Sequence, residues 1–278
     1  MLQCVITNLM DYLKYIAKTG RTHQHPYGQK GTYLLLEKLP KNLTNKTILE
    51  VGCGTGHTAA ILSKYDNLFY TGVDTSLDMI NFSNKRKEKL NLTNCNFKHT
   101  TIYNAHFKNN YFDVIICESV LAIQDFDSFH RILKECFRIL KHEGVFIFNE
   151  TLWNERTKKE TIKKTNSLAS KHFGIIQAEP SATLNKWIYA LKKNGFNHIN
   201  TNQITKNNCD NTSIKIDTLE ARSLNYSKKS KYLKSLNLRY LFLYFYFKFK
   251  NKAIKINSGE LETYIFTAKK QKQSKNNG

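Results

Sequence analysis

The sequence predicts an α/β protein built on a doubly wound sheet that is mostly parallel, with an antiparallel last strand. Between residues 47 and 150, short and nearly continuous apolar segments alternate with segments of helical periodicity. Strands that are covered by helices on both faces have this apolar character without alternation, so a parallel sheet is indicated. The first apolar segment also runs directly into a glycine-rich turn, LEVGCGTG, and then into a helical pattern.

The elements of this first part follow in order along the chain. Apolar periodicity predicts two N-terminal helices, over about residues 1–20 and 31–39, and Pro40 closes the second. Ser76 is a good N-cap for the helix over 77–90. The five expected strands are residues 47–51, 68–74, 94–99, 112–118 and 144–150, and the other helical patterns are 57–65 and 129–141.

The pattern is less regular after residue 150. Residues 154–172 are polar and lysine-rich and predict a loop or a helical insertion. An amphipathic helix is predicted over 181–195, with Ser181 as its cap and Gly195 at its end. Strands are predicted over 196–204 and 261–270. The basic and aromatic stretch 224–256 is compatible with a helix, a covering element or a surface-binding patch.

These segments predict a helical lid over 1–40 and one main domain over 41–270, with insertions at about 151–180 and 205–260. A disordered basic tail is expected over 271–278. The N-terminus lacks the features of a signal peptide, and no stretch of about 18 apolar residues predicts a membrane span. The six cysteines have no zinc-binding spacing, so no metal site is predicted; Cys117 and Cys136 are expected to be buried, as in a reduced cytoplasmic protein.

The net charge of the chain is +21 and is unevenly distributed. Residues 1–150 contain 18 Lys and Arg against 14 Asp and Glu, whereas residues 151–278 contain 25 against 8. A basic half is typical of proteins that bind nucleic acid or an anionic membrane surface. It also arises from composition drift, because lysine and asparagine are both abundant.

The glycine-rich turn indicates which ligand the protein binds. Gly52, Gly54 and Gly56 have the spacing G-x-G-x-G, which differs from the G-x-G-x-x-G of dinucleotide folds, and no lysine follows as in a Walker loop. Glu50 precedes the turn. A carboxylate there disfavours a pyrophosphate and suits a ligand that carries an ammonium group.

This turn resembles motif I of the class I S-adenosylmethionine-dependent methyltransferases, which have a Rossmann-like fold. GVDTS (72–76), FDVIICESVLAI (112–123) and RILKHEGVFIFNE (138–150) resemble further motifs of the family, in the right order. The resemblance implies that Asp74 binds both ribose hydroxyls. Thr101 stands where the family often has an acid for the adenine amino group, so a weaker adenine contact is expected, with Ile102 against the ring. The implied cofactor site is Tyr27, Glu50, Gly52, Cys53, Gly54, Gly56, Asp74, Thr75, Met79, Thr101, Ile102 and Glu118.

The predicted reaction is a direct displacement on the sulfonium methyl group, which orientation of the nucleophile can accelerate without a strong base. Glu118, at the end of the fourth strand, is a candidate base or cofactor-orienting group. The segment RTHQHPYG resembles an HPGG-type segment that covers the cofactor in some of these enzymes. Its histidines His23 and His25 are candidate catalytic residues. Trp153 is a candidate for the substrate pocket, and Trp187 is expected in the core.

Three function classes remain open on the sequence. The first is a methyltransferase that acts on a small molecule and yields S-adenosylhomocysteine. The second is an RNA methyltransferase whose basic half follows the phosphates. The third is a non-catalytic or membrane-surface module that uses 224–256 as an interfacial helix. Motifs for methylating exocyclic base nitrogens or cytosine C5 are missing after the fourth strand, which disfavours the second class.

Overall fold

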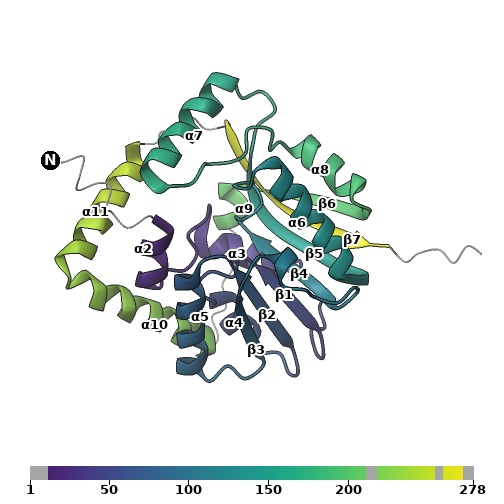
Figure 1. The fold of residues 1–278 in the computed structure, drawn as a ribbon, viewed down its shortest axis with the longest axis horizontal. Helices are drawn as coiled ribbons and strands as arrows, with labels where there is room; N and C mark the ends of the chain where they lie inside the picture. Colours follow the sequence, from purple (N-terminus) through teal and green to yellow (C-terminus); the bar gives the residue numbers. More distant parts are fainter. Residues whose placement is uncertain (1–11, 211–217, 254–258, 272–278) are drawn as a thin grey trace, which may run out of the picture.

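A seven-stranded sheet forms the centre of the molecule (Figure 1). The computed structural model describes residues 12–210, 218–253 and 259–271. The strand order is β3-β2-β1-β4-β5-β7-β6, and β7 runs antiparallel to both of its neighbours, which confirms the predicted fold class. The strands are β1 (Thr47–Val51), β2 (Phe69–Asp74), β3 (Cys95–His99), β4 (Phe112–Glu118), β5 (Leu140–Trp153), β6 (Phe196–Ile204) and β7 (Leu261–Lys270).

Helices cover both faces of the sheet, and each face has its own apolar core. On one face α6 (Phe126–Ile139) and α8 (Leu184–Lys193) pack on β4, β5 and β7. On the other face lie α3 (Gly28–Leu36), α4 (His57–Leu62) and α5 (Leu77–Leu90). Trp187 is 4% exposed and stacks on Phe129, so its predicted place in the core is confirmed. Cys117 and Cys136 are buried, as predicted.

Several element boundaries differ from the predictions because side chains cap the helices elsewhere. The helix predicted from residue 129 begins at Phe126, where Asp125 accepts a hydrogen bond from the Ser128 amide. The prediction of Ser181 as a cap was wrong: its hydroxyl donates to Glu179, and α8 begins only after Thr183. Ser76 does cap α5, as predicted, by accepting from the Met79 amide.

Trp153 corrects another prediction, because it lies in the core and not in a substrate pocket. The fifth strand extends from Leu140 to Trp153, well beyond the predicted 144–150, because β7 pairs with it from Val145 to Trp153 and Phe112 of β4 pairs with Leu140. The Trp153 side chain is 1% exposed, and its ring nitrogen donates to the Ala178 carbonyl. It therefore anchors the loop that follows α7 (Lys159–Phe173).

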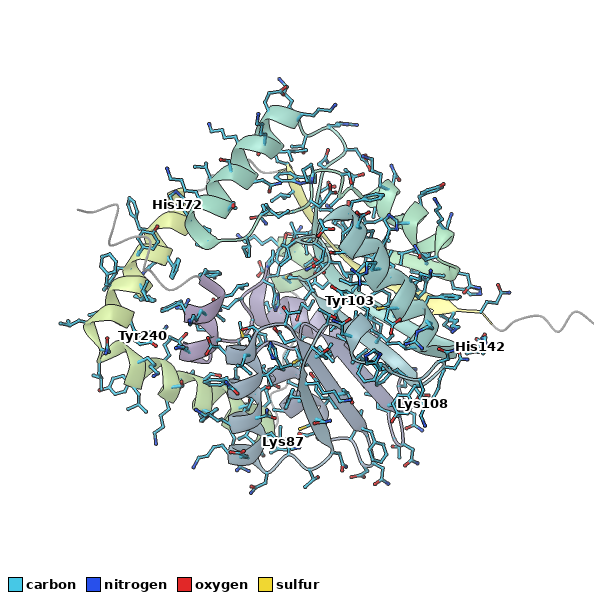
Figure 2. All side chains as sticks on the ribbon, viewed as in Figure 1. Lys87, Tyr103, Lys108, His142, His172 and Tyr240 are labelled. Atoms are coloured by element: carbon cyan, nitrogen blue, oxygen red, sulfur yellow. The ribbon has the colours of Figure 1, made fainter. Side chains whose placement is uncertain are left out.

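The remaining helices gather at one side of the molecule (Figure 1). These are α2 (Tyr12–Thr19), α7, α10 (Thr218–Ser235) and α11 (Leu238–Ala253), while α9 (Lys206–Asp210) follows β6 and a short 3-10 helix, η1 (Ile102–Asn104), follows β3. A third apolar cluster joins α2, α5 and α11. In Figure 2, His172 near the end of α7 lies beside α11. The first eleven residues of the predicted N-terminal helix and the predicted tail from residue 272 onward lie outside the described residues.

Candidate functional site

The three glycines of the turn after β1 are required for different reasons. All three have positive φ: +73° at Gly52, +51° at Gly54 and +73° at Gly56. A Cβ at Gly52 would lie 2.2 Å from a methyl of Val120, and one at Gly56 would lie 2.8 Å from the Cβ of Ser83. A Cβ at Gly54 would meet no atom within 4 Å. Two glycines therefore allow close packing, while Gly54 faces open space in which a ligand can approach the backbone.

Glu50 places a buried carboxyl group beneath this turn. The residue is 4% exposed, and the Tyr70 hydroxyl donates a hydrogen bond to its carboxyl group. Burial raises the pKa of Glu50 to about 8, against the lowering effect of the hydrogen bonds from Tyr70 and Thr58. The carboxyl is thus largely protonated at neutral pH, and a cation placed beside it would favour its ionised form.

Asp74 lies at the end of β2, where its carboxylate supports the turn. One oxygen accepts from the Gly54 amide at 2.9 Å and the other from the Ser76 amide at 2.8 Å. Burial raises the pKa of Asp74 above its ordinary value. The predicted contact with ribose hydroxyls would use the remaining lone pairs of this carboxylate.

The predicted adenine-side residues have other partners in the fold. The Thr101 hydroxyl caps η1 by accepting from the Asn104 amide, and Ile102 is 2% exposed within the core of the α6 face. Thr75 is exposed, and its carbonyl contacts the ring of His99. None of these three residues lines the cavity described next. Met79, another predicted cofactor residue, does line it.

A cavity of about 620 Å³ opens between the glycine turn and the helices α2 and α7. Its two sides differ in character. One side is polar and is formed by the turn, the segment 21–26 and the end of β4. The other side is apolar and comprises Tyr12, Leu13, Ile16, Ala122, Ile123, Ala169, Phe173, Ile175 and Ile176. The volume is that of a typical small-molecule site.

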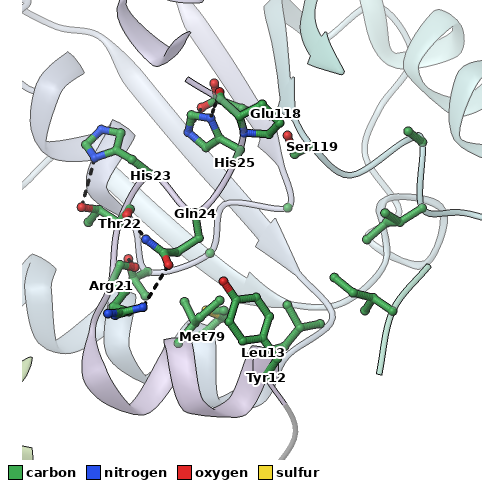
Figure 3. A pocket seen from close by; sticks show the side chains of 18 of the residues that line it. Tyr12, Leu13, Arg21, Thr22, His23, Gln24, His25, Met79, Glu118 and Ser119 are labelled. Atoms are coloured by element: carbon green, nitrogen blue, oxygen red, sulfur yellow. Dashed lines mark hydrogen bonds and ion pairs between the residues drawn. The ribbon is translucent and has the colours of Figure 1, made fainter. Parts of the chain in front are cut away.

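His25 and Glu118 lie together on the polar side of the cavity (Figure 3). The His25 Nε2 atom is 3.2 Å from a Glu118 oxygen and 3.1 Å from the Thr32 hydroxyl. Thr32 also donates to Glu118 at 3.0 Å, and the Asn149 amide donates to its other oxygen at 2.9 Å. Residues 93 positions apart in the chain thus form one hydrogen-bonded group, in which Glu118 is held in a fixed orientation.

His23 lines the same cavity but has a different environment. Its Nδ1 contacts the Thr22 hydroxyl at 3.1 Å, and its buried Nε2 has no hydrogen-bond partner among the described residues. Burial, together with His57, His25 and Arg86, lowers the pKa of His23 to about 2, so the ring is neutral. Tyr27, by contrast, is 41% exposed and does not line the cavity.

Sequence reasoning missed a buried polar cluster that attaches α10 to the turn. Arg86 of α5 is 0% exposed and donates to the carbonyl of Thr55, to the carbonyl and hydroxyl of Ser223, and to the hydroxyl of Ser227. His57 contacts the same Ser223 hydroxyl at 2.6 Å. One signal in the sequence could have indicated that Arg86 is buried: it lies four residues after Phe82, and therefore on the same face of α5.

Two kinds of feature are not found in the part of the chain that the structure covers. No group of three or more His, Cys, Asp or Glu there has an arrangement that could hold a metal ion. No helix there is both long and apolar enough to cross a bilayer.

The chain is similar in sequence to known methyltransferases. The methyltransferase domain family matches residues 42–233. A ribosomal RNA small subunit methyltransferase C from Buchnera aphidicola subsp. Baizongia pistaciae is 31% identical over 163 residues, which are 53% of this chain and 47% of that protein. A demethylmenaquinone methyltransferase from Thermotoga maritima is 31% identical over 120 residues, 43% of this chain and 47% of that protein. The chain thus matches about half the length of these relatives.

A solved structure shows the same fold over most of the chain. The phosphoethanolamine N-methyltransferase 2 of Haemonchus contortus, in complex with phosphomonomethylethanolamine and S-adenosylhomocysteine, superposes with a TM-score of 0.67. It is 18% identical, and the match covers 94% of this chain and 57% of that one. At this identity the likeness concerns the fold.

Proposed function

The chain belongs to the methyltransferase domain family, as a class I S-adenosylmethionine-dependent enzyme, and we propose that its methyl acceptor is a small molecule with an apolar portion. The observation that carries this proposal is the cavity, which has the glycine turn on one side and an apolar wall from α2 and α7 on the other. An acceptor bound against that wall would have its reactive atom near Glu118.

The residues of the turn fit the cofactor. Open space at Gly54 lets a ligand lie against the backbone, and buried Glu50 supplies a carboxyl group for an ammonium group. Asp74 accepts one amide hydrogen bond on each oxygen, and its remaining lone pairs could accept from ribose hydroxyls. When bound, S-adenosylmethionine would supply a methyl group that passes to the acceptor's nucleophile as the methyl–sulfur bond breaks, with S-adenosylhomocysteine as the leaving group.

In this proposal the helices α2 and α7 exclude water from the apolar side of the cavity, where the acceptor binds. Leu13 and Ile16 of α2 and Phe173 of α7 bring apolar side chains over the cavity, and Tyr12 contacts Phe173 with ring centroids 5.1 Å apart. An acceptor held against these groups loses its solvent and its rotational freedom. Both effects favour direct displacement.

Glu118 is the group proposed to take the acceptor's proton. His25, Thr32 and Asn149 fix its two oxygens, so a hydroxyl or amine of the acceptor would meet a carboxylate of defined orientation. His25 acts as a positioning residue in this scheme. An acceptor nucleophile that carries no proton would not need this step.

Glu118→Gln should lower kcat by about 100-fold, because a positioned base contributes two to four orders of magnitude. The amide keeps the shape of the side chain, so the affinity for S-adenosylhomocysteine should change little. Calorimetry measures that affinity, and methyl transfer to the acceptor identified below measures kcat. Glu160→Gln, an exposed substitution on α7, is the matched control. Loss of cofactor affinity in Glu118→Gln would instead assign Glu118 to cofactor orientation.

The acceptor class is tested by incubating the protein with methyl-labelled S-adenosylmethionine and a cell extract, and then separating small molecules, RNA and protein. Label in the small-molecule fraction that extracts into organic solvent is expected. Label confined to the RNA fraction would contradict the proposal.

An RNA acceptor is the second candidate, and two observations favour it. A relative with 31% identity is named as a ribosomal RNA methyltransferase, and the chain has a net charge of +21. Binding through phosphates would weaken steeply with salt. Absence of RNA binding at low salt would eliminate this candidate.

A further inference from the structure

Helix α11 has two apolar faces on opposite sides. One face is buried: Leu243 is 1% exposed and Phe247 is 5% exposed. The Phe247 ring lies 5.1 Å from Tyr12 and 6.0 Å from Phe173, measured between centroids. This face attaches α11 to α2 and α7, the two helices that form the apolar wall of the cavity.

The opposite face is apolar as well, but it is exposed. Leu238, Phe242, Phe245 and Phe249 are 82%, 58%, 58% and 69% exposed. Their spacing of i, i+4, i+7 and i+11 places them in a single row along the helix, the outer stripe. Figure 2 shows α11, with Tyr240 labelled, at the outer edge of the molecule. A continuous exposed row of this kind is typical of an interaction surface.

Exposed cations lie on α10 and α11. The four lysines of α10 and Lys248 of α11 are exposed. Lys231 and Lys234 lie over the rings of Tyr244 and Tyr240, 5.1 Å and 5.3 Å from the centroids, on a side of α11 that the outer stripe does not include. Glu220, the acidic residue of these two helices, is buried. The α10–α11 pair therefore combines an apolar row with positive charge on its flanks, which no exposed acid of the two helices offsets.

This combination matches the surface of an anionic bilayer, because the apolar row enters the interface while the lysines meet acidic headgroups. A second copy of the chain would oppose the same positive charge to this face. Single-stranded RNA is typically bound in a positively charged groove whose rings stack on the bases, whereas the outer stripe lies along the outward side of a single helix.

We propose that the α10–α11 face docks the protein on the surface of an anionic bilayer, with the outer stripe of α11 lying in the interface. Docking would place the bilayer on the outer side of α11, and α11 would separate it from α2, α7 and the apolar wall of the cavity. The inference rests on the exposed stripe and the lysines, so it does not depend on the identity of the acceptor.

The test is co-sedimentation of the full chain with large unilamellar vesicles. Vesicles of equal parts phosphatidylglycerol and phosphatidylcholine should bind the protein at low salt, and phosphatidylcholine vesicles should bind it weakly. Raising the salt to about 0.5 M should reduce binding, because the headgroup attraction is screened. The double variant Phe242→Ser, Phe245→Ser should bind the anionic vesicles at least about tenfold more weakly, since two partly inserted phenylalanines are lost.

Phe69→Ser is the matched control, because Phe69 is 55% exposed and lies at the start of β2, in the sheet and away from α11. It should bind vesicles like the parent. Absence of binding to anionic vesicles at low salt would overturn the proposal, and so would equal binding by the double variant. A dimer that the double variant abolishes, without lipid binding, would assign the stripe to a second copy. Binding of a single-stranded RNA oligonucleotide in place of vesicles would assign it to nucleic acid.

Discussion

Gly52, Gly54 and Gly56 share a positive φ, but only Gly54 has free space where a side chain would stand. At the residue scale, Gly52 and Gly56 are needed for packing, whereas Gly54 leaves room for a ligand. The same distinction applies to the carboxylates. Glu50, Glu118 and Glu150 all line the cavity, but Glu150 also accepts from the amides of Val120 and Leu121 and so holds the loop after β4.

Gly54→Ala should therefore impair binding more than folding. A left-handed conformation costs a non-glycine residue roughly 1–2 kcal/mol, so the melting temperature should fall by only a few degrees. The new methyl group would occupy the space beside the turn and weaken the affinity for S-adenosylhomocysteine at least tenfold, as measured by calorimetry. Gly56→Ala is the comparison: it should unfold at a lower temperature, since its Cβ would press on Ser83. Parental affinity in Gly54→Ala would contradict this interpretation of the turn.

At the scale of elements, α10 is the part of the basic half that packs against α3 and α5 through buried polar contacts. Its Ser223 and Ser227 hydroxyls accept from Arg86, and its Glu220 accepts from Gln29 and Tyr33 of α3. Burying a charged group costs desolvation free energy, and removing its hydrogen-bond partners destabilises the fold further because the buried charge is then unsatisfied. Burial lowers the pKa of Arg86 to about 10, which still leaves it cationic at neutral pH.

Arg86→Met should release α10 from the domain. It removes the donors to both serines and to the Thr55 carbonyl, and unsatisfied buried groups cost about 1–3 kcal/mol each. We expect a lower melting temperature and faster trypsin cleavage after the lysines of α10. Lys85→Met, an exposed neighbour on the same helix, is the control and should change neither. Unchanged proteolysis in Arg86→Met would show that α10 is held by other contacts.

At the scale of the whole molecule, the buried acids make stability depend on pH. The folded-state pKa of Glu50, about 8, lies above its ordinary value of 4.5. Between these two values the unfolded chain has released the proton and the folded chain has not. Stability is therefore highest below pH 4.5 as far as this group is concerned, and it declines as the pH rises through this window. Glu150, with a pKa of about 7, acts in the same direction.

Glu50→Gln should flatten this decline. One pKa unit corresponds to about 1.4 kcal/mol. Between pH 5 and pH 8 the free energy of unfolding of the parent should therefore fall by a few kcal/mol more than that of the variant. Thermal melts at both pH values measure the difference, and the exposed Glu37→Gln serves as control. Comparing variant with parent cancels the contributions of the histidines. A pH dependence identical to the parent's would indicate that Glu50 is ionised in the folded protein.

Much of the fold follows from local sequence. The sequence pattern located all seven strands: the central parallel strands β1, β4 and β5 are largely apolar and bounded by turns, whereas β3 and β6 alternate between buried and exposed residues. The order of motifs located the cofactor side as well, since the turn and Asp74 follow β1 and β2 directly. Boundaries were less well predicted where a partner decides them: β5 extends to Trp153 because β7 pairs with it.

By itself the sequence determined the family, the sheet, the glycine turn and the excess of positive charge, all of which are carried by residues close together in the chain. Only the tertiary structure decided that His25 meets Glu118, that α10 reaches Arg86, and that α2 and α7 close one cavity. These contacts join residues far apart in the chain, and hydrophobic periodicity specifies which face of an element is buried but not which element covers it.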